Sequence, residues 1–114
     1  MRATFLCLLA LAGAADAQDS FKRLSADEIR ARIVGHTVTD DFHWSDRFPP
    51  DGTVAAVQLG NAVRTVWKLQ GNELCVTRKY KRGTEDECVE VWSKGDAIEY
   101  RRDGVTVNWG FLRH

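Results

Sequence analysis

After its first residues, the chain has no apolar run approaching the roughly 20 residues that a membrane-spanning helix needs. It also has no net charge, because 16 Lys and Arg residues balance 16 Asp and Glu residues. We therefore expect no nucleic-acid partner, since phosphate binding requires a clear basic excess. The chain contains no linker, low-complexity stretch or repeat, so its length predicts a single domain.

Recognisable catalytic and metal-binding motifs are also missing. No Gly-x-Ser-x-Gly segment marks a nucleophile, and the carboxylates show no pairing signal. His36, Asp40, Asp41 and His43 lie close together, but their spacing matches no metal-ligand motif and is typical of a polar turn after a helix. We therefore expect no metal, no cofactor and no enzyme activity.

Residues 1–17 have the three-part order of a secretory signal peptide. Arg2 supplies the positive charge, residues 5–12 form a short apolar run, and residues 15–17 offer the small side chains that signal peptidase reads. Cleavage there leaves residues 18–114 as a single β-rich domain. This pattern predicts a periplasmic or secreted protein.

Cleavage leaves two cysteines, Cys75 and Cys88. An oxidising compartment and an even cysteine count predict a disulfide between them. It closes a loop of about 14 residues and stabilises the fold by about 3 kcal/mol in the chain-entropy model. The rival is a two-cysteine zinc site, which needs two more ligands from histidines that do not lie at finger spacing.

The sequence predicts one short helix at residues 25–34 followed only by strands. Ser25 and Glu28 have the spacing of a capping box, and Gly35 is a natural C-terminal stop. Turns containing glycine then recur every 8 to 12 residues or so, as in an antiparallel meander. The predicted strands lie near residues 37–40, 42–48, 53–59, 63–69, 73–80, 88–93, 97–101 and 105–112.

These elements define a mainly β (α+β) fold class. About eight antiparallel strands in a meander can close into a small barrel or form a strongly curved open sheet. We expect a barrel-like or half-closed sheet with the helix plugging one end. Trp67 and Trp109 alternate with aliphatic residues and are predicted to lie in the core, and Val105, Val107 and Phe111 share the face of Trp109.

The disulfide sets the register of one hairpin. If Cys75 lies opposite Cys88, then Leu74 lies opposite Val89 on the core face. The disulfide and Trp92 then occupy the other face. The tip of this hairpin is expected to project into water.

The same hairpin carries the candidate interaction residues Arg78, Lys79, Lys81 and Arg82. They face an acidic return strand, which is typical of a solvated hairpin with charges paired across the strands. The alternative is a charged contact loop for a partner protein, with the disulfide holding its base rigid. Trp92 becomes a binding anchor if it is exposed.

Four fold-building segments follow one another along the chain: Ser25-Ala26-Asp27-Glu28-Ile29 before Gly35, Pro50-Asp51-Gly52-Thr53, Val66-Trp67-x-Leu69-x-Gly71-Asn72-x-Leu74-Cys75, and Cys88. In this order they resemble a loose group of small periplasmic proteins of proteobacteria whose function is uncharacterised. The resemblance implies a periplasmic setting and a helix plus antiparallel meander with one disulfide, and it names no chemistry. The strand pattern is also similar to that of small lipocalin-type barrels, an analogy of fold that does not assign a ligand.

Our leading hypothesis from the sequence is an exported, non-enzymatic binding or protein-interaction module whose partner is another periplasmic protein. One alternative is a lipocalin-like carrier that holds a small apolar ligand in a barrel lined by Val, Leu and Trp. A second alternative is a small periplasmic hydrolase, which requires a pocket of convergent polar groups. The sequence makes no prediction of the oligomeric state.

The first prediction concerns the exported protein, which should have the mass of residues 18–114 less the hydrogens lost in forming one disulfide. Intact-mass spectrometry, with and without reduction, measures both changes. A chain that retains residues 1–17, or two thiols that alkylate without prior reduction, would contradict it.

Overall fold

The computed structural model describes residues 20–114, which form nine strands and one helix. The predicted signal peptide at residues 1–17 lies outside the described residues. The predicted mainly β fold with one short helix is confirmed. The elements are β1 (Lys22–Arg23), α2 (Ala26–Arg32), β2 (Thr37–Thr39), β3 (Trp44–Arg47), β4 (Thr53–Gln58), β5 (Asn61–Gln70), β6 (Glu73–Tyr80), β7 (Gly83–Lys94), β8 (Ala97–Arg102) and β9 (Val105–Arg113).

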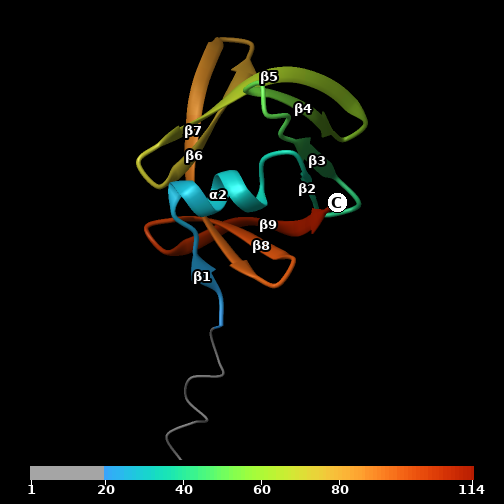
Figure 1. The fold of residues 1–114 in the computed structure, drawn as a ribbon. Coiled ribbons are helices and arrows are strands. Elements are labelled where there is room, and N and C mark those ends of the chain that lie inside the picture. Colours follow the sequence, from blue (N-terminus) through green and yellow to red (C-terminus); the bar gives the residue numbers. More distant parts are fainter. Residues whose placement is uncertain (1–19) are drawn as a thin grey trace, which may run out of the picture.

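The eight strands from β2 to β9 form a closed antiparallel barrel (Figure 1). Each strand pairs with the next one along the chain, and β9 returns to β2, where Thr37 lies opposite Arg113. The short strand β1, which the sequence pattern did not predict, pairs with β7 beside Trp92 and Ser93. The pairing of β9 with β2 closes the ring and confirms the barrel-like alternative.

The helix α2 begins with the predicted capping box. The Ser25 hydroxyl accepts a hydrogen bond from the Glu28 N–H at 3.2 Å, and the Glu28 carboxylate accepts one from the Ser25 N–H at 2.9 Å. Ile29 on the helix and Ile33 at its C-cap are fully buried. A helix this short is stabilised mainly by such docking rather than by its own propensity.

This helix covers one end of the barrel and lies across the ring of strands in Figure 1. Arg32 donates hydrogen bonds to the Ser93 hydroxyl and the Gly95 carbonyl, both at 2.8 Å, at the turn between β7 and β8. The Ala26 N–H donates to the Asn72 side chain at 2.9 Å, in the turn between β5 and β6. The opposite end, which holds the β4–β5, β6–β7 and β8–β9 turns, has no such cover among the described residues.

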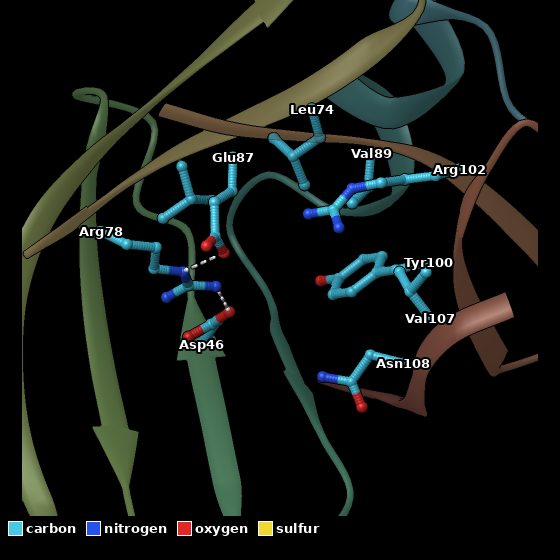
Figure 2. Close-up of a pocket in the computed structure, with 10 residues that line it drawn as sticks. Asp46, Leu74, Arg78, Glu87, Val89, Tyr100, Arg102, Val107 and Asn108 are labelled. Carbon is cyan, nitrogen blue, oxygen red and sulfur yellow. Dashed lines mark hydrogen bonds and ion pairs between the residues drawn. The ribbon is translucent and has the colours of Figure 1, made fainter. Parts of the chain in front are cut away.

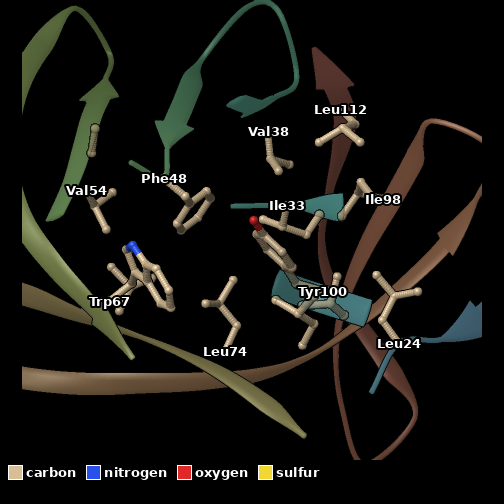
Figure 3. Packing of buried hydrophobic residues seen from close by; sticks show 14 residues of the cluster. Leu24, Ile33, Val38, Phe48, Val54, Trp67, Leu74, Ile98, Tyr100 and Leu112 are labelled. Atoms are coloured by element: carbon tan, nitrogen blue, oxygen red, sulfur yellow. The ribbon is translucent and has the colours of Figure 1, made fainter. Parts of the chain in front are cut away.

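Apolar side chains fill the half of the barrel next to α2 (Figure 3). Trp67 lies in this core, as predicted, and its indole N–H donates to the Pro49 carbonyl at 3.1 Å. Full burial of each large apolar side chain contributes about 1.5–3 kcal/mol. The buried cluster consists of Leu24, Ile29, Ile33, Val38, Phe48, Val54, Ala56, Trp67, Leu74, Val76, Val91, Ile98, Tyr100 and Leu112.

The predicted core face of β9 is wrong. Trp109 is 53% exposed and packs edge-on against Phe111, whereas Gly110 and Leu112 on the other face are buried. The reason lies in the pairing with β8, where buried Ile98 is opposite Gly110. Since directly opposite residues point to the same face of a sheet, Gly110 faces inward and Trp109 faces out.

The Cys75–Cys88 disulfide joins β6 to β7 in the predicted register, with Leu74 opposite Val89. The disulfide lies outside the main apolar cluster, although Cys75 itself is buried. β7 begins at Gly83, earlier than predicted, so the ladder with β6 continues up to a two-residue turn. The hairpin is therefore a paired ribbon almost to its tip.

The barrel wall parts between β5 and β6 at the uncovered end. The ladder between these strands stops where Trp67 lies opposite Val76. Beyond that pair, residues 61–66 of β5 pair only with β4, and residues 77–80 of β6 pair only with β7. A closed barrel at one end thus becomes two separate hairpins at the other.

The second prediction concerns Gly110. A Cβ atom added there would lie 2.8 Å from the Thr39 carbonyl oxygen and 3.2 Å from the Trp44 ring. We expect Gly110→Ala to lower the free energy of unfolding by about 1–3 kcal/mol, because the contact forces the backbone to move. Urea denaturation measures the loss. Val105→Ala on the same strand is the control, since Val105 is 65% exposed and should change stability by at most about 0.5 kcal/mol.

Candidate functional site

The uncovered end of the barrel contains a cavity of about 240 Å³ (Figure 2). Its inner wall is apolar where it meets the core, and its outer part carries charged and amide groups. Five strands contribute to it, so the barrel itself holds the side chains in position. The lining residues are Asp46, Leu74, Val76, Arg78, Glu87, Val89, Tyr100, Arg102, Val107 and Asn108.

Arg78 lies at the centre of the charged part. Its guanidinium is 3.2 Å from an Asp46 carboxylate oxygen on β3 and 3.6 Å from a Glu87 carboxylate oxygen on β7. Figure 2 shows both ion pairs within the barrel. Glu87 also accepts a hydrogen bond from the Tyr80 hydroxyl. The sequence placed Arg78 among the surface interaction candidates, but its side chain is 22% exposed and points into the barrel.

Asp46 has one carboxylate oxygen that is bound and one that is not. Its Oδ2 atom pairs with Arg78, while its buried Oδ1 atom has no hydrogen-bond partner in the part of the chain that the structure describes. Burial raises the pKa of this carboxyl, and the nearby Arg78 guanidinium only partly offsets that rise. A buried acceptor without a partner is costly and is typical of a functional position.

Tyr100 presents a second such group to the same cavity. Its hydroxyl is buried and has no hydrogen-bond partner among residues 20–114. Burial and the neighbouring Asp46 carboxylate both raise the pKa of this hydroxyl, so it stays protonated. In Figure 2 the hydroxyl points toward the space beside Arg78 and Asp46. Asn108 adds an amide that can donate and accept at the same opening.

The arrangement can therefore bind a polar group. Asp46 Oδ1 can accept a hydrogen bond, and the Tyr100 hydroxyl can donate or accept one. The residues that line this cavity include no Ser, Cys, His or Lys. Among residues 20–114, no group of three or more His, Cys, Asp and Glu side chains could hold a metal ion.

The remaining interaction candidates lie apart from this cavity. Trp92 is half-buried, because the Arg101 guanidinium lies 4.1 Å from its ring centroid and its indole N–H donates to Glu90 at 2.9 Å. Lys79, Lys81 and Arg82 are exposed on the β6–β7 hairpin, where Arg82 pairs with Glu85 at 3.0 Å. The structure therefore does not bring the five candidates together in one site.

The polar residues after the helix build a turn. The Asp40 carboxylate accepts hydrogen bonds from the backbone N–H groups of Phe42, His43 and Trp44, at 2.7 to 3.1 Å, and contacts the His43 ring at 2.8 Å. Burial alone would raise the pKa of Asp40, but these donors together hold it well below its usual range. The Asp40 side chain thus shapes the connection between β2 and β3.

Sequence reasoning missed Asp46, Tyr100 and Asn108. A signal for Asp46 was present, because it alternates with Trp44 and Phe48 and so places a carboxylate on an inward face. Tyr100 likewise alternates with buried Ile98. Asn108 gave no signal, since it lies opposite Tyr100 only through a register shift between β8 and β9.

Comparison with known proteins gives no further assignment: no protein-family model, curated protein or solved structure matches this chain. In residues 20–114, no helix is long and apolar enough to cross a membrane.

The third prediction concerns the charge on Asp46. Because its pKa is raised on folding, the stability it contributes is fully present below the unfolded pKa near 3.8 and is lost as the pH rises through the folded pKa. We therefore expect the free energy of unfolding of the wild type, relative to Asp46→Asn, to fall with rising pH across that window. Urea denaturation from pH 3 to 8 or so measures the difference. Asp103→Asn, at an exposed turn, controls for the loss of one negative charge. A difference that stays constant or increases with pH would contradict the buried-carboxylate assignment.

Proposed function

We propose that this protein is an exported, non-enzymatic binding protein that takes a small ligand into the uncovered end of its barrel. The observation that carries the proposal is a pair of buried polar atoms at one cavity, Asp46 Oδ1 and the Tyr100 hydroxyl, that have no partner among residues 20–114. A ligand that bonds to both would remove the cost of leaving them unpaired. The signal-peptide pattern and the resemblance to periplasmic proteins support export, and the disulfide is consistent with it.

The lining indicates the chemical class of the ligand. Leu74, Val76 and Val89 provide an apolar inner wall, whereas Asp46 and Arg78 make the outer part polar. The best fit is a small amphipathic molecule whose hydroxyl or amide group donates to Asp46 and also bonds to Tyr100. A purely apolar ligand fits less well, because it would bury these groups without partners.

The size of the cavity limits the ligand as well. A volume of about 240 Å³ is below the roughly 300–1,000 Å³ typical of pockets for drug-sized molecules. The other end of the barrel is filled by Trp67, Phe48 and the rest of the buried cluster, so the cavity cannot extend toward α2. We therefore expect a compact ligand rather than a long acyl chain.

The fourth prediction tests this proposal. Protein purified from the export compartment should show an additional mass under native conditions that is lost on denaturation, and the released compound should raise the thermal unfolding midpoint of the bare protein. Tyr100→Phe removes one hydroxyl and should weaken binding of that compound by about tenfold, as expected for the loss of one buried hydrogen bond.

Tyr80→Phe is the matched control, because it removes a hydroxyl that already donates to Glu87 and lies outside the 240 Å³ cavity. Its affinity for the compound should stay close to that of the wild type. A bare native mass, together with no shift in unfolding midpoint from a set of small alcohols and amides, would overturn the proposal. Equal weakening by both substitutions would also count against it.

A further inference from the structure

A second binding surface lies where the barrel wall parts, and it does not rest on the ligand proposed above. We use the name "β5–β6 slot" for the space between residues 61–66 and residues 77–80. A cavity of about 390 Å³ lies on its inner side and shares Arg78, Glu87 and Asn108 with the 240 Å³ cavity. The Thr65 hydroxyl donates to the Thr77 carbonyl at 2.7 Å near its inner end. In Figure 1 the tips of the β4–β5 and β6–β7 hairpins lie apart beyond this point.

Like charges would face each other if the two strands stayed paired. The last pair of the ladder is Trp67 with Val76, and the same register continued outward would put Arg64 directly opposite Lys79. Like charges in that position destabilise a sheet. Neither cation forms a salt bridge within residues 20–114, although the Arg64 charge adds to the Thr53 hydrogen bonds in lowering the pKa of Asp51. Both side chains are exposed, so two positive charges flank the slot.

Backbone groups line both sides of the slot. On β5, Trp67 donates its N–H to Gly52 at 2.9 Å, on the side of β4. Because the direction of backbone bonding alternates along a strand, Ala62, Arg64 and Val66 direct their N–H and C=O groups away from β4 and toward the slot. On β6, Tyr80 pairs with Gly83 of β7 at the turn of the hairpin, and the bonding direction alternates from there. The N–H and C=O groups of Thr77 and Lys79 are therefore directed into the slot.

Backbone groups that pair with no neighbouring strand within residues 20–114 are a template for an added strand, although the Thr77 carbonyl already accepts the Thr65 hydroxyl. A second copy of this chain is a poor occupant, because pairing two β5 edges brings Arg64 near Arg64, and pairing β5 with β6 repeats the Arg64–Lys79 conflict. The chain's own acidic edge, on β7, has its outward Asp86 held by Lys68 at 3.1 Å and by Thr77 at 2.8 Å. Charge complementarity therefore favours a different chain that brings its own carboxylates.

We propose that the β5–β6 slot receives an extended, acidic peptide segment of a partner protein, which adds a strand to the barrel wall between β5 and β6. Backbone hydrogen bonds to both edges supply the binding, and carboxylates on alternate residues of the peptide face Arg64 and Lys79. Residues between them face inward, next to Val63 and Tyr80. The peptide completes the ring where β5 and β6 part.

The experiment uses the full exported chain and three short fluorescein-labelled peptides. One alternates Val and Glu, the second has Lys in place of Glu, and the third is the Glu peptide with every second amide N-methylated. By fluorescence anisotropy, the Glu peptide should bind, and the other two should bind at least about tenfold more weakly. Bound Glu peptide should also slow hydrogen exchange at the amides of Ala62, Arg64 and Val66.

Charge reversal provides the second arm. Arg64→Glu places a carboxylate opposite Lys79, so the wall should close and the affinity for the Glu peptide should fall by about tenfold or more. The double variant Arg64→Glu/Lys79→Glu restores the like-charge conflict with the opposite sign, and it should bind the Lys peptide instead. Arg47→Glu, an equal charge change at an exposed position on β3, should leave binding of the Glu peptide unchanged.

Three results would overturn the proposal. Equal binding of the N-methylated peptide would mean that charge attracts the peptide without strand addition. Equal loss of binding in Arg47→Glu would mean that net charge, rather than the slot, controls the affinity. A wild-type dimer in analytical ultracentrifugation that Arg64→Glu dissociates would assign the slot to a second copy. The peptide comparison on the wild type needs no variant to fold.

Discussion

The ion pair between Arg78 and Asp46 joins β6 to β3 across the interior of the barrel, and both candidate surfaces depend on it. Breaking this pair is costly, because it leaves the buried Asp46 carboxylate without its ion-pair partner. Since side chains alternate along a strand, an inward Arg78 forces Thr77 and Lys79 to point outward. One pairing therefore determines which groups line the cavity and which charge lies on the outer wall.

The two ends of the barrel differ in chemistry because the inward-facing side chains change from apolar to charged along a strand. On β6 the row runs from Leu74 through Val76 to Arg78, so the apolar half lies next to α2 and the charged half lies at the far end. The apolar half is packed and covered by the helix. The charged half cannot pack in the same way, because Arg78 and Asp46 need hydrogen-bonding partners, and a cavity results.

Local patterns in the sequence were enough to predict most of the fold. The capping box at Ser25, the glycine turns and the Cys75–Cys88 register each depend on a few neighbouring residues, and all three agree with the structure. The inward face of β9 and the candidate site could not be predicted in this way. Trp109 faces outward because β9 must pair with both β8 and β2, which is a property of the closed ring. Arg78 meets Asp46 only because closure brings distant strands together.

The position of the disulfide has a consequence for local opening of the hairpin. Cys75 lies on β6 next to the last residue paired with β5, and Cys88 lies on β7 just before the stretch paired with β8. The cross-link therefore lies at the base of the ribbon formed by residues 77–86. Thermal fraying that starts at the tip can separate the two strands only as far as this covalent stop. The ribbon can open and re-form many times while the barrel below it keeps its register.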